Sequence, residues 1–144
     1  MAEEAQVEWL SFAGVDWLAV LVAYAVSFGF GWWYYSPAGV WNIWKRAANI
    51  SDEGLNDTST AIAFGGTIVA NALGVIVLAV LMAQLDATSW VDGLVLGAIL
   101  GFVYRMGAHA IHNGFAARSP KVTALDGIHD TVALAIAGLI LGLF

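Results

Sequence analysis

Four long apolar stretches constrain this chain more than any other feature of its sequence. They cover residues 16–36, 61–84, 91–115 and 124–144. A helix that crosses the ~30 Å hydrocarbon core of a bilayer needs about 20 mostly apolar residues. None of the four stretches alternates in polarity as a barrel strand does, and backbone groups in lipid must be hydrogen-bonded within a helix or a closed barrel. We therefore predict an all-α integral membrane protein with four transmembrane helices in an up-down bundle.

The composition supports this assignment and excludes other classes of protein. Of the 144 residues, 60% are hydrophobic and 11% are charged, whereas soluble domains carry about 25% charged residues. A small globule cannot hide that much apolar surface. The formal charge of −6 opposes binding to nucleic acid, and the absence of cysteine excludes disulfide scaffolds and thiolate metal sites. We therefore expect residues 1–144 to form a single four-helix membrane domain.

The segments outside the apolar stretches carry further signals. Residues 1–14 are acidic where a cleavable signal peptide would be basic, and we expect them to form a short amphipathic tail at the membrane surface. In the first loop, Trp41 and Trp44 stand beside Lys45 and Arg46. Aromatic and basic residues in this arrangement are typical of a helix that lies on a membrane. We therefore predict a short interfacial helix in the first loop.

The basic residues indicate the direction of the helices, because Lys and Arg accumulate in short loops on the cytoplasmic side. Lys45 and Arg46 lie in the first loop, and Arg118 and Lys121 lie in the third. In a bundle of four antiparallel spans these two loops share one face. The opposite face carries acidic residues instead, namely Glu3, Glu4, Glu8, Asp16, Asp86 and Asp92. We therefore predict that both termini lie outside.

Ionisable residues within the third and fourth spans are costly in lipid, so each is a functional hypothesis by default. This candidate polar cluster comprises Arg105, His109, His112, Asp126, His129 and Asp130. On each helix its members follow one helical stripe. With a rise of 1.5 Å per residue, Arg105 and Asp130 share a depth near the cytoplasmic edge. We expect the two stripes to face each other and Arg105 to pair with Asp130, with Thr67 of the second span at a similar depth and Asn71 nearer the bilayer centre.

Three interpretations of the candidate polar cluster remain open. The first is a structural ion pair between Arg105 and Asp130, surrounded by hydrated histidines. The second is a relay for protons or a solute, because histidine titrates near neutral pH and carboxylates in a low dielectric readily bind protons. The third is a metal or pigment site with imidazole and carboxylate ligands. An arginine would repel a metal cation there, and the chain has no HExxH-like pattern.

Small and aromatic residues form two further patterns. Gly97-x-x-x-Gly101 and Gly138-x-x-x-Gly142 allow close backbone approach, either within one bundle or between copies of the chain. An aromatic rim is expected at the cytoplasmic level, formed by Trp32, Trp33, Tyr34, Tyr35, Trp41 and Trp44. Catalytic patterns are absent, since Ser36 has no G-x-S-x-G context. We therefore predict no catalytic residue, no metal ligand and no cofactor.

The order of several residues along the chain is distinctive. An early segment contains Leu18–Ala23, Gly31, Trp33, Tyr35, Ser36, Pro37 and Trp44. A later segment contains Phe115, Arg118, Lys121, Gly127, Ala137, Gly138, Leu141 and Gly142. With these residues the chain resembles, over nearly its whole length, a bacterial and archaeal membrane family known as domain of unknown function 1761. The resemblance implies a multipass protein of the prokaryotic cell (inner) membrane and implies no particular activity.

On these grounds we expect a non-enzymatic membrane protein that acts through helix association, as a homo-oligomer or as an accessory subunit of a larger membrane complex. The alternative is a small oligomeric transporter or proton-linked permease that uses the candidate polar cluster. A metal- or pigment-binding membrane subunit is a further alternative. The expected partners are membrane lipids, further copies of the chain or other membrane subunits, and not nucleic acid.

Overall fold

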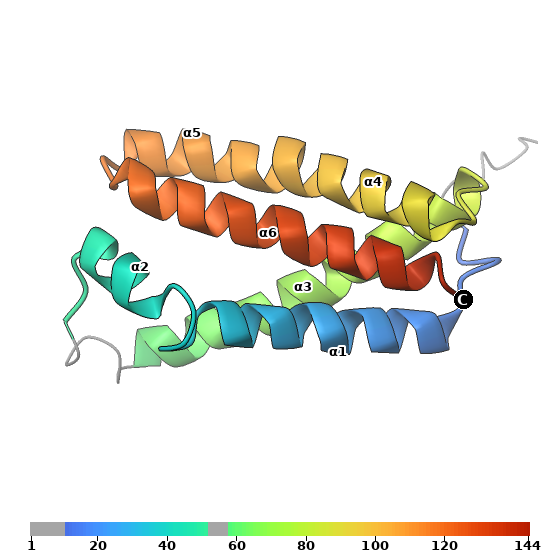
Figure 1. Cartoon of the computed structure of the whole chain (residues 1–144), viewed down its shortest axis with the longest axis horizontal. Coiled ribbons are helices and arrows are strands. Elements are labelled where there is room, and N and C mark those ends of the chain that lie inside the picture. The colour runs from blue at the N-terminus through green and yellow to red at the C-terminus, as the bar shows by residue number, and fades with distance from the viewer. Residues whose placement is uncertain (1–10, 52–57) are drawn as a thin grey trace, which may run out of the picture.

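A computed structural model of the protein describes residues 11–51 and 58–144, and over these residues the fold is helical, without a strand. Four helical segments of this part of the chain are long and apolar enough to cross a membrane. They run up and down in one bundle (Figure 1): α1 (Trp17–Tyr34), α3 (Thr58–Gln84), the continuous segment of α4 (Trp90–Leu100), η2 (Gly101–Met106) and α5 (Gly107–Phe115), and α6 (Pro120–Leu141). The predicted four-helix architecture is confirmed.

Capping residues fix where three of these helices begin. The Asp16 side chain accepts hydrogen bonds from two backbone N–H groups in the first turn of α1. Ser89 and Asp92 form a reciprocal capping box at the start of α4. The fourth span begins at Pro120 rather than at residue 124, because Ser119 caps it and proline suits the first helical position. The other bounds differ from the expected ones by no more than three residues.

The predicted short helix of the first loop is present as α2 (Trp41–Ala48), with Lys45 and Arg46 in its last turn. It ends at Asn49, whose left-handed conformation (φ 55°) closes the helix. α2 lies beside the first turns of α6 at one end of the bundle (Figure 1). The expected amphipathic tail falls largely on residues 1–10, which lie outside the described residues.

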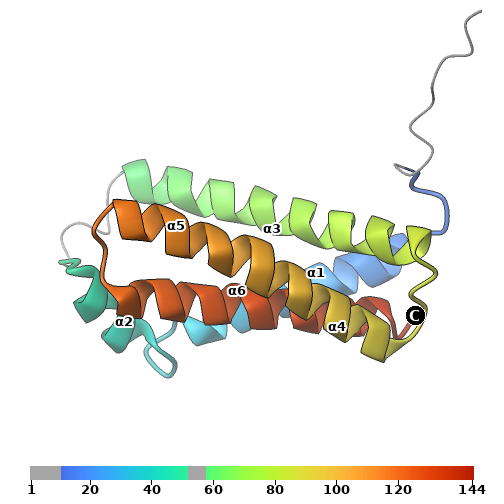
Figure 2. The same ribbon diagram turned by 90° about the horizontal axis from the view of Figure 1, so that it is seen from above.

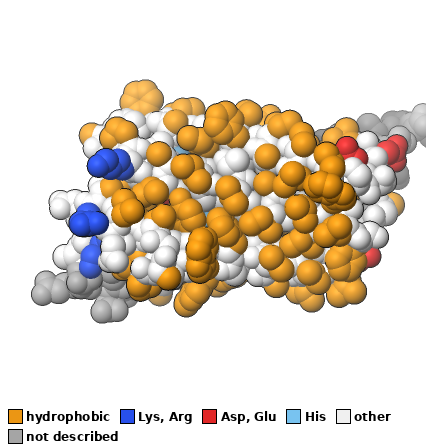
Figure 3. Space-filling view, in the orientation of Figure 1, with side chains coloured by type: hydrophobic (Ala, Val, Ile, Leu, Met, Phe, Trp, Pro, Cys, Tyr) orange, Lys and Arg blue, Asp and Glu red, His pale blue; other side chains and the backbone are white. Residues whose placement is uncertain are grey.

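The two ends of the bundle carry opposite charges. Lys and Arg side chains appear at the end formed by α2 and the α5–α6 turn, whereas Asp side chains appear at the end that holds the C-terminus (Figure 3). On the face that Figure 3 shows, hydrophobic side chains cover most of the surface between the two ends. The first and third loops therefore share one end, as the four antiparallel spans predicted.

α6 packs closely against α4 and η2 through glycines on both sides. A Cβ atom on Gly93, Gly97 or Gly101 would collide with backbone atoms of α6. A Cβ atom on Gly138 or Gly142 would likewise collide with backbone atoms of α4 or of the turn before it. Glycine permits this approach because it has no side chain. Of the two possibilities that the sequence left open for the helix-packing glycines, the structure places Gly97, Gly101, Gly138 and Gly142 in contacts within one chain.

The third span contains a π-helical turn that the sequence did not predict. Gly101 opens this turn and packs against backbone atoms of Asp130 and Thr131, while Arg105 lies near its end. π turns are rare and occur frequently at functional sites. Because Gly101 is level with Asp130, Arg105 starts about one helical turn away from that level. The expected equal depth of Arg105 and Asp130 is therefore wrong by about one turn.

α3 crosses the bundle obliquely and leaves it at one end. Its C-terminal half supplies Val75, Leu78 and Met82 to the core, where they pack with Ala23 of α1 and Ala137 of α6. Every residue from 61 to 70 in its N-terminal half is exposed. Figure 1 shows this half apart from α5. Figure 2 shows it apart from α1 and α6. The helices therefore separate at the end where the candidate polar cluster lies.

Candidate functional site

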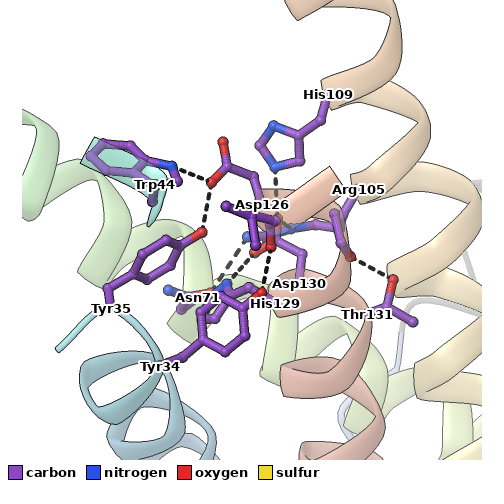
Figure 4. A network of polar contacts seen from close by, with 12 residues as sticks. Tyr34, Tyr35, Trp44, Asn71, Arg105, His109, Asp126, His129, Asp130 and Thr131 are labelled. Carbon is purple, nitrogen blue, oxygen red and sulfur yellow. Dashed lines mark hydrogen bonds and ion pairs between the residues drawn. The ribbon is translucent and has the colours of Figure 1, made fainter. Parts of the chain in front are cut away.

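Asp130 on α6 is the centre of a polar network that draws on every helical segment except α4 (Figure 4). Arg105 Nε donates a hydrogen bond to Asp130 Oδ2 over 2.9 Å. His109 Nε2 lies 3.1 Å from the same oxygen, and His129 Nδ1 lies 2.9 Å from Asp130 Oδ1. Asp130 is buried, with 9% of its surface exposed. The predicted ion pair is confirmed, and two histidines share its carboxylate.

Arg105 reaches Asp130 across the offset of one turn because helical side chains point toward the N-terminus of their own helix. The Arg105 side chain therefore extends back toward Gly101, and the Asp130 side chain extends toward the start of α6. Arg105 Nη2 also donates to Asn71 Oδ1 on α3 over 3.5 Å. The guanidinium joins two helices in this way, while about a third of the side chain (31%) stays exposed.

Asp126 lies one turn before Asp130 and binds neutral donors only. Its Oδ1 atom accepts hydrogen bonds from the Tyr35 hydroxyl over 2.7 Å and from Trp44 Nε1 over 2.8 Å. Burial and the hydrogen bond to Asp126 raise the pKa of the Tyr35 hydroxyl, so that it remains a donor. Among the described residues, the ion pair of Arg105 and the contacts of His109 and His129 are all made with Asp130, and no basic side chain pairs with Asp126. Asp126 thus fastens the end of α1 and the helix α2 to α6.

His129 is clamped by aromatic rings from α1. It stacks on Phe30 with ring centroids 5.8 Å apart and an interplanar angle of 5°, and it contacts Tyr34 and Tyr35 at 5.4 and 5.0 Å. His129 Nε2 is buried and has no hydrogen-bond partner among the described residues. It lies against Gly31, where a Cβ atom would stand 2.7 Å from Nε2. Gly31 therefore leaves the space that the imidazole occupies.

Two adjoining cavities open beside the network where α3 leaves the bundle, and together we name them the amphipathic cavity. One part, of about 380 Å³, is lined mainly by aromatic and apolar side chains, including Phe28, Trp32, Trp41 and Phe64. The other part, of about 390 Å³, is lined by the network residues, including Arg105, His109, Asp126 and Asp130. Tyr35, Thr67, Asn71 and His129 line both parts.

The structure brings together most of the predicted site residues. It leaves out His112, whose side chain is exposed on α5. Of the aromatic rim, Tyr34, Tyr35, Trp41 and Trp44 pack at the network, whereas Trp32 and Trp33 are 71% and 57% exposed. No group of three or more His, Asp or Glu side chains in the described part of the chain could hold a metal ion.

Sequence reasoning missed three features of the site. It did not predict the hydrogen bonds from Trp44 and Tyr35 to Asp126. These residues are separated from Asp126 by 82 and 91 positions in the sequence, so the bonds depend on how α1 and α2 pack on α6. It gave Gly31 no role in shaping a pocket for His129. A glycine directly before an aromatic run was the available signal, but glycine is common in membrane helices. It also did not anticipate the cavity, which depends on the path of α3.

The fold and the site define a class of protein: a four-helix membrane bundle with a buried ionic network beside a cavity. The sequence matches the family described as "Protein of unknown function (DUF1761)" over residues 18–142, and the chain belongs to that family. Comparison with curated proteins gives no match, and comparison with solved structures gives none either.

Proposed function

We propose that the protein is a non-enzymatic membrane protein that binds a small solute in the amphipathic cavity and links this binding to proton transfer, as a small permease would. The observation that carries the proposal is the position of Asp130, which binds Arg105, His109 and His129 and lines a cavity of about 390 Å³. A purely structural ion pair needs neither two titratable partners nor an adjoining cavity.

The arrangement suits a proton relay. Arg105 keeps a positive charge beside Asp130 and so favours its carboxylate form. Histidine is the side chain whose ordinary charge change lies near neutral pH, and the network contains two, His109 and His129. Their nitrogens approach opposite oxygens of one carboxylate, with His109 34% exposed and His129 12% exposed. A proton can therefore pass between the partly exposed histidine and the buried one by way of Asp130, whose carboxylate takes up the proton from one ring and gives it to the other.

The location of the protein forms part of the proposal. We place it in a prokaryotic cell membrane with the basic end of the bundle in the cytoplasm and both termini outside. In this orientation the amphipathic cavity lies near the cytoplasmic surface. A solute could reach it from the lipid or the cytoplasm through the gap beside α3.

Association with a partner is a second candidate function, favoured by the exposed half of α3. Residues 61–70 are all exposed, with the Tyr24 hydroxyl of α1 donating a hydrogen bond to the Ile68 carbonyl over 3.5 Å, and a Cβ atom on Gly65 or Gly66 would meet nothing within 4 Å. We propose this face, rather than the glycines of α4 and α6, as the contact of a homo-oligomer or of an accessory subunit. The mass of the protein in native nanodiscs tests this: a monomer with no bound partner would contradict it.

Proton flux in proteoliposomes tests the proposed transport function. A pH-sensitive dye is trapped inside, and three solutes are supplied outside: benzyltrimethylammonium as a cation, phenylmethanesulfonate as an anion and benzyl alcohol as a neutral compound. We expect at least one solute to drive a proton flux that His129→Gln abolishes. His112→Gln is the matched control and should leave the flux unchanged, because His112 lies outside the network. The absence of solute-driven flux for all three solutes would contradict the proposal.

A further inference from the structure

The charges of the polar network do not balance. α6 contributes the carboxylates of Asp126 and Asp130, and η2 contributes the guanidinium of Arg105. Among the described residues, the remaining groups that line the network or hydrogen-bond to it are uncharged when the histidines are neutral: Tyr34, Tyr35, Trp44, Thr67, Asn71, His109 and His129. Two negative charges and one positive charge leave the network with one net negative charge.

This net charge resides at Asp126 rather than at Asp130. Asp130 has Arg105 as its partner, whereas Asp126 receives hydrogen bonds from Tyr35 and Trp44, both of which are neutral. A carboxylate without a cation is costly to hold in a low dielectric. Its second oxygen, Oδ2, takes part in none of these hydrogen bonds, and Asp126 lines the polar part of the cavity. A positive charge at this point would complete the network.

The other part of the cavity is suited to the body of such a cation. Phe28, Trp32, Trp41 and Phe64 line it, and Tyr35 lies between this part and Asp126. Aromatic faces attract cations and also bury apolar groups. A volume of about 380 Å³ lies within the usual range for small-molecule sites. The two parts together fit a molecule with a positive head and an apolar body.

From this charge count and this lining, we propose that the amphipathic cavity binds a monovalent organic cation with an apolar body, and that the cation competes with a proton on His109 or His129. Either one neutralises the network, so binding the cation releases the proton. An anion would add a second negative charge beside Asp126. A neutral solute would leave the imbalance in place. This inference rests on the proposed function and names the class of solute.

Calorimetric binding to the full-length protein in nanodiscs tests this inference, with benzyltrimethylammonium as the cationic probe and phenylmethanesulfonate as its anionic counterpart. We expect the cation to bind and to release up to one proton, measured from the heats in buffers of different ionisation enthalpy. Because the cation and a proton compete, its affinity should fall by up to about tenfold for each unit by which the pH is lowered. The anion should show no binding that depends on the protein.

Asp126→Asn should weaken binding of the cation by at least about tenfold, since it removes the charge that holds the head. Its amide oxygen can still accept the hydrogen bonds from Tyr35 and Trp44, so the fold should persist, which near-UV circular dichroism checks. Asp86→Asn is the matched control: Asp86 is exposed at the opposite end of the bundle, and asparagine tolerates its positive φ of 51°. It should bind the cation like the parent.

Equal affinity of the Asp126→Asn variant and the parent would overturn the inference, as would binding of the anion in place of the cation. Proton flux driven by phenylmethanesulfonate or benzyl alcohol, without binding of the cation, would overturn the solute class and leave the proposed function standing. Binding of the cation without proton release would overturn the competition with a proton and, with it, the proton link of the proposed function.

Discussion

His129 on α6 occupies a space that Gly31 on α1 leaves open, and the edge of the imidazole lies against the backbone of that glycine. A Cβ atom on Gly31 would stand 2.7 Å from His129 Nε2. The ring cannot move aside freely, because Phe30 stacks on it and Tyr35 packs against it. Its Nδ1 atom is also tied to Asp130 over 2.9 Å. The contact between α1 and α6 therefore determines where one of the two network histidines stands.

Gly31→Ala should destabilise the protein by about 1–3 kcal/mol, the usual penalty for an added methyl group in a packed site. The same change should shift the imidazole resonances of His129 in an NMR spectrum of selectively labelled protein. Gly29→Ala is the matched control on the same helix, since a Cβ atom there meets nothing within 4 Å. A Gly31→Ala variant as stable as the Gly29→Ala variant, with His129 unshifted, would contradict the described packing.

Removal of one partner of the ion pair between Arg105 and Asp130 should destabilise the protein more than removal of both. Asp130→Ala leaves Arg105 without its carboxylate, at a cost of about 3 kcal/mol. We place this value at the low end of the range because about a third of the Arg105 side chain (31%) is exposed. Arg105→Leu combined with Asp130→Leu leaves an apolar seam and should recover most of the loss.

The measurement for the ion pair is thermal unfolding in mild detergent. Arg118→Leu provides the control, because Arg118 is exposed at the α5–α6 turn and its removal should change stability by less than about 0.5 kcal/mol. Two single variants as stable as the parent, or a double variant no better than Asp130→Ala, would show that the pair contributes little to the fold.

Gly97→Ala should separate α4 from α6, because its Cβ atom would collide with the backbone of Leu134. Backbone atoms cannot rotate away as side chains do, so we expect a loss of at least about 2 kcal/mol. Gly107→Ala, in the same span but with nothing within 4 Å of its Cβ position, should be nearly neutral. Thermal unfolding compares the two. Loss of oligomer mass without loss of stability in Gly97→Ala would instead place this glycine between copies of the chain.

The fold could be predicted from the sequence because each span is set by a local property. An apolar run of sufficient length identifies a membrane helix whatever its neighbours are, and caps such as Asp16 and Ser119 refine its ends. The ion pair was predictable for a similar reason, since its members follow helical stripes on consecutive antiparallel helices. The equal depth expected for the pair was wrong because Gly101, and not Arg105, packs level with Asp130.

The cavity and the π turn were not predictable, because they depend on how the helices pack. The composition of α3 is apolar on all sides, so the sequence does not tell which half of it leaves the bundle. The π turn at Gly101–Met106 has no composition of its own. His112 and His109 look alike in the sequence, and only the packing of α5 on α6 separates an exposed histidine from one bound to Asp130.

The predicted orientation in the membrane can be measured on single-cysteine variants, because the natural chain has no cysteine that would react. Lys121→Cys lies in the first turn of α6, next to the α5–α6 turn, and Thr88→Cys lies just before α4, beside Ser89, whose backbone packs against Gly142 near the C-terminus. Lys and Arg mark cytoplasmic loops because they resist transfer across the membrane. In intact cells, a membrane-impermeant thiol reagent should therefore label position 88 and not position 121. Permeabilised cells should show labelling at both positions, which controls for reactivity. Labelling at position 121 alone in intact cells would reverse the orientation and would place the amphipathic cavity near the outer surface.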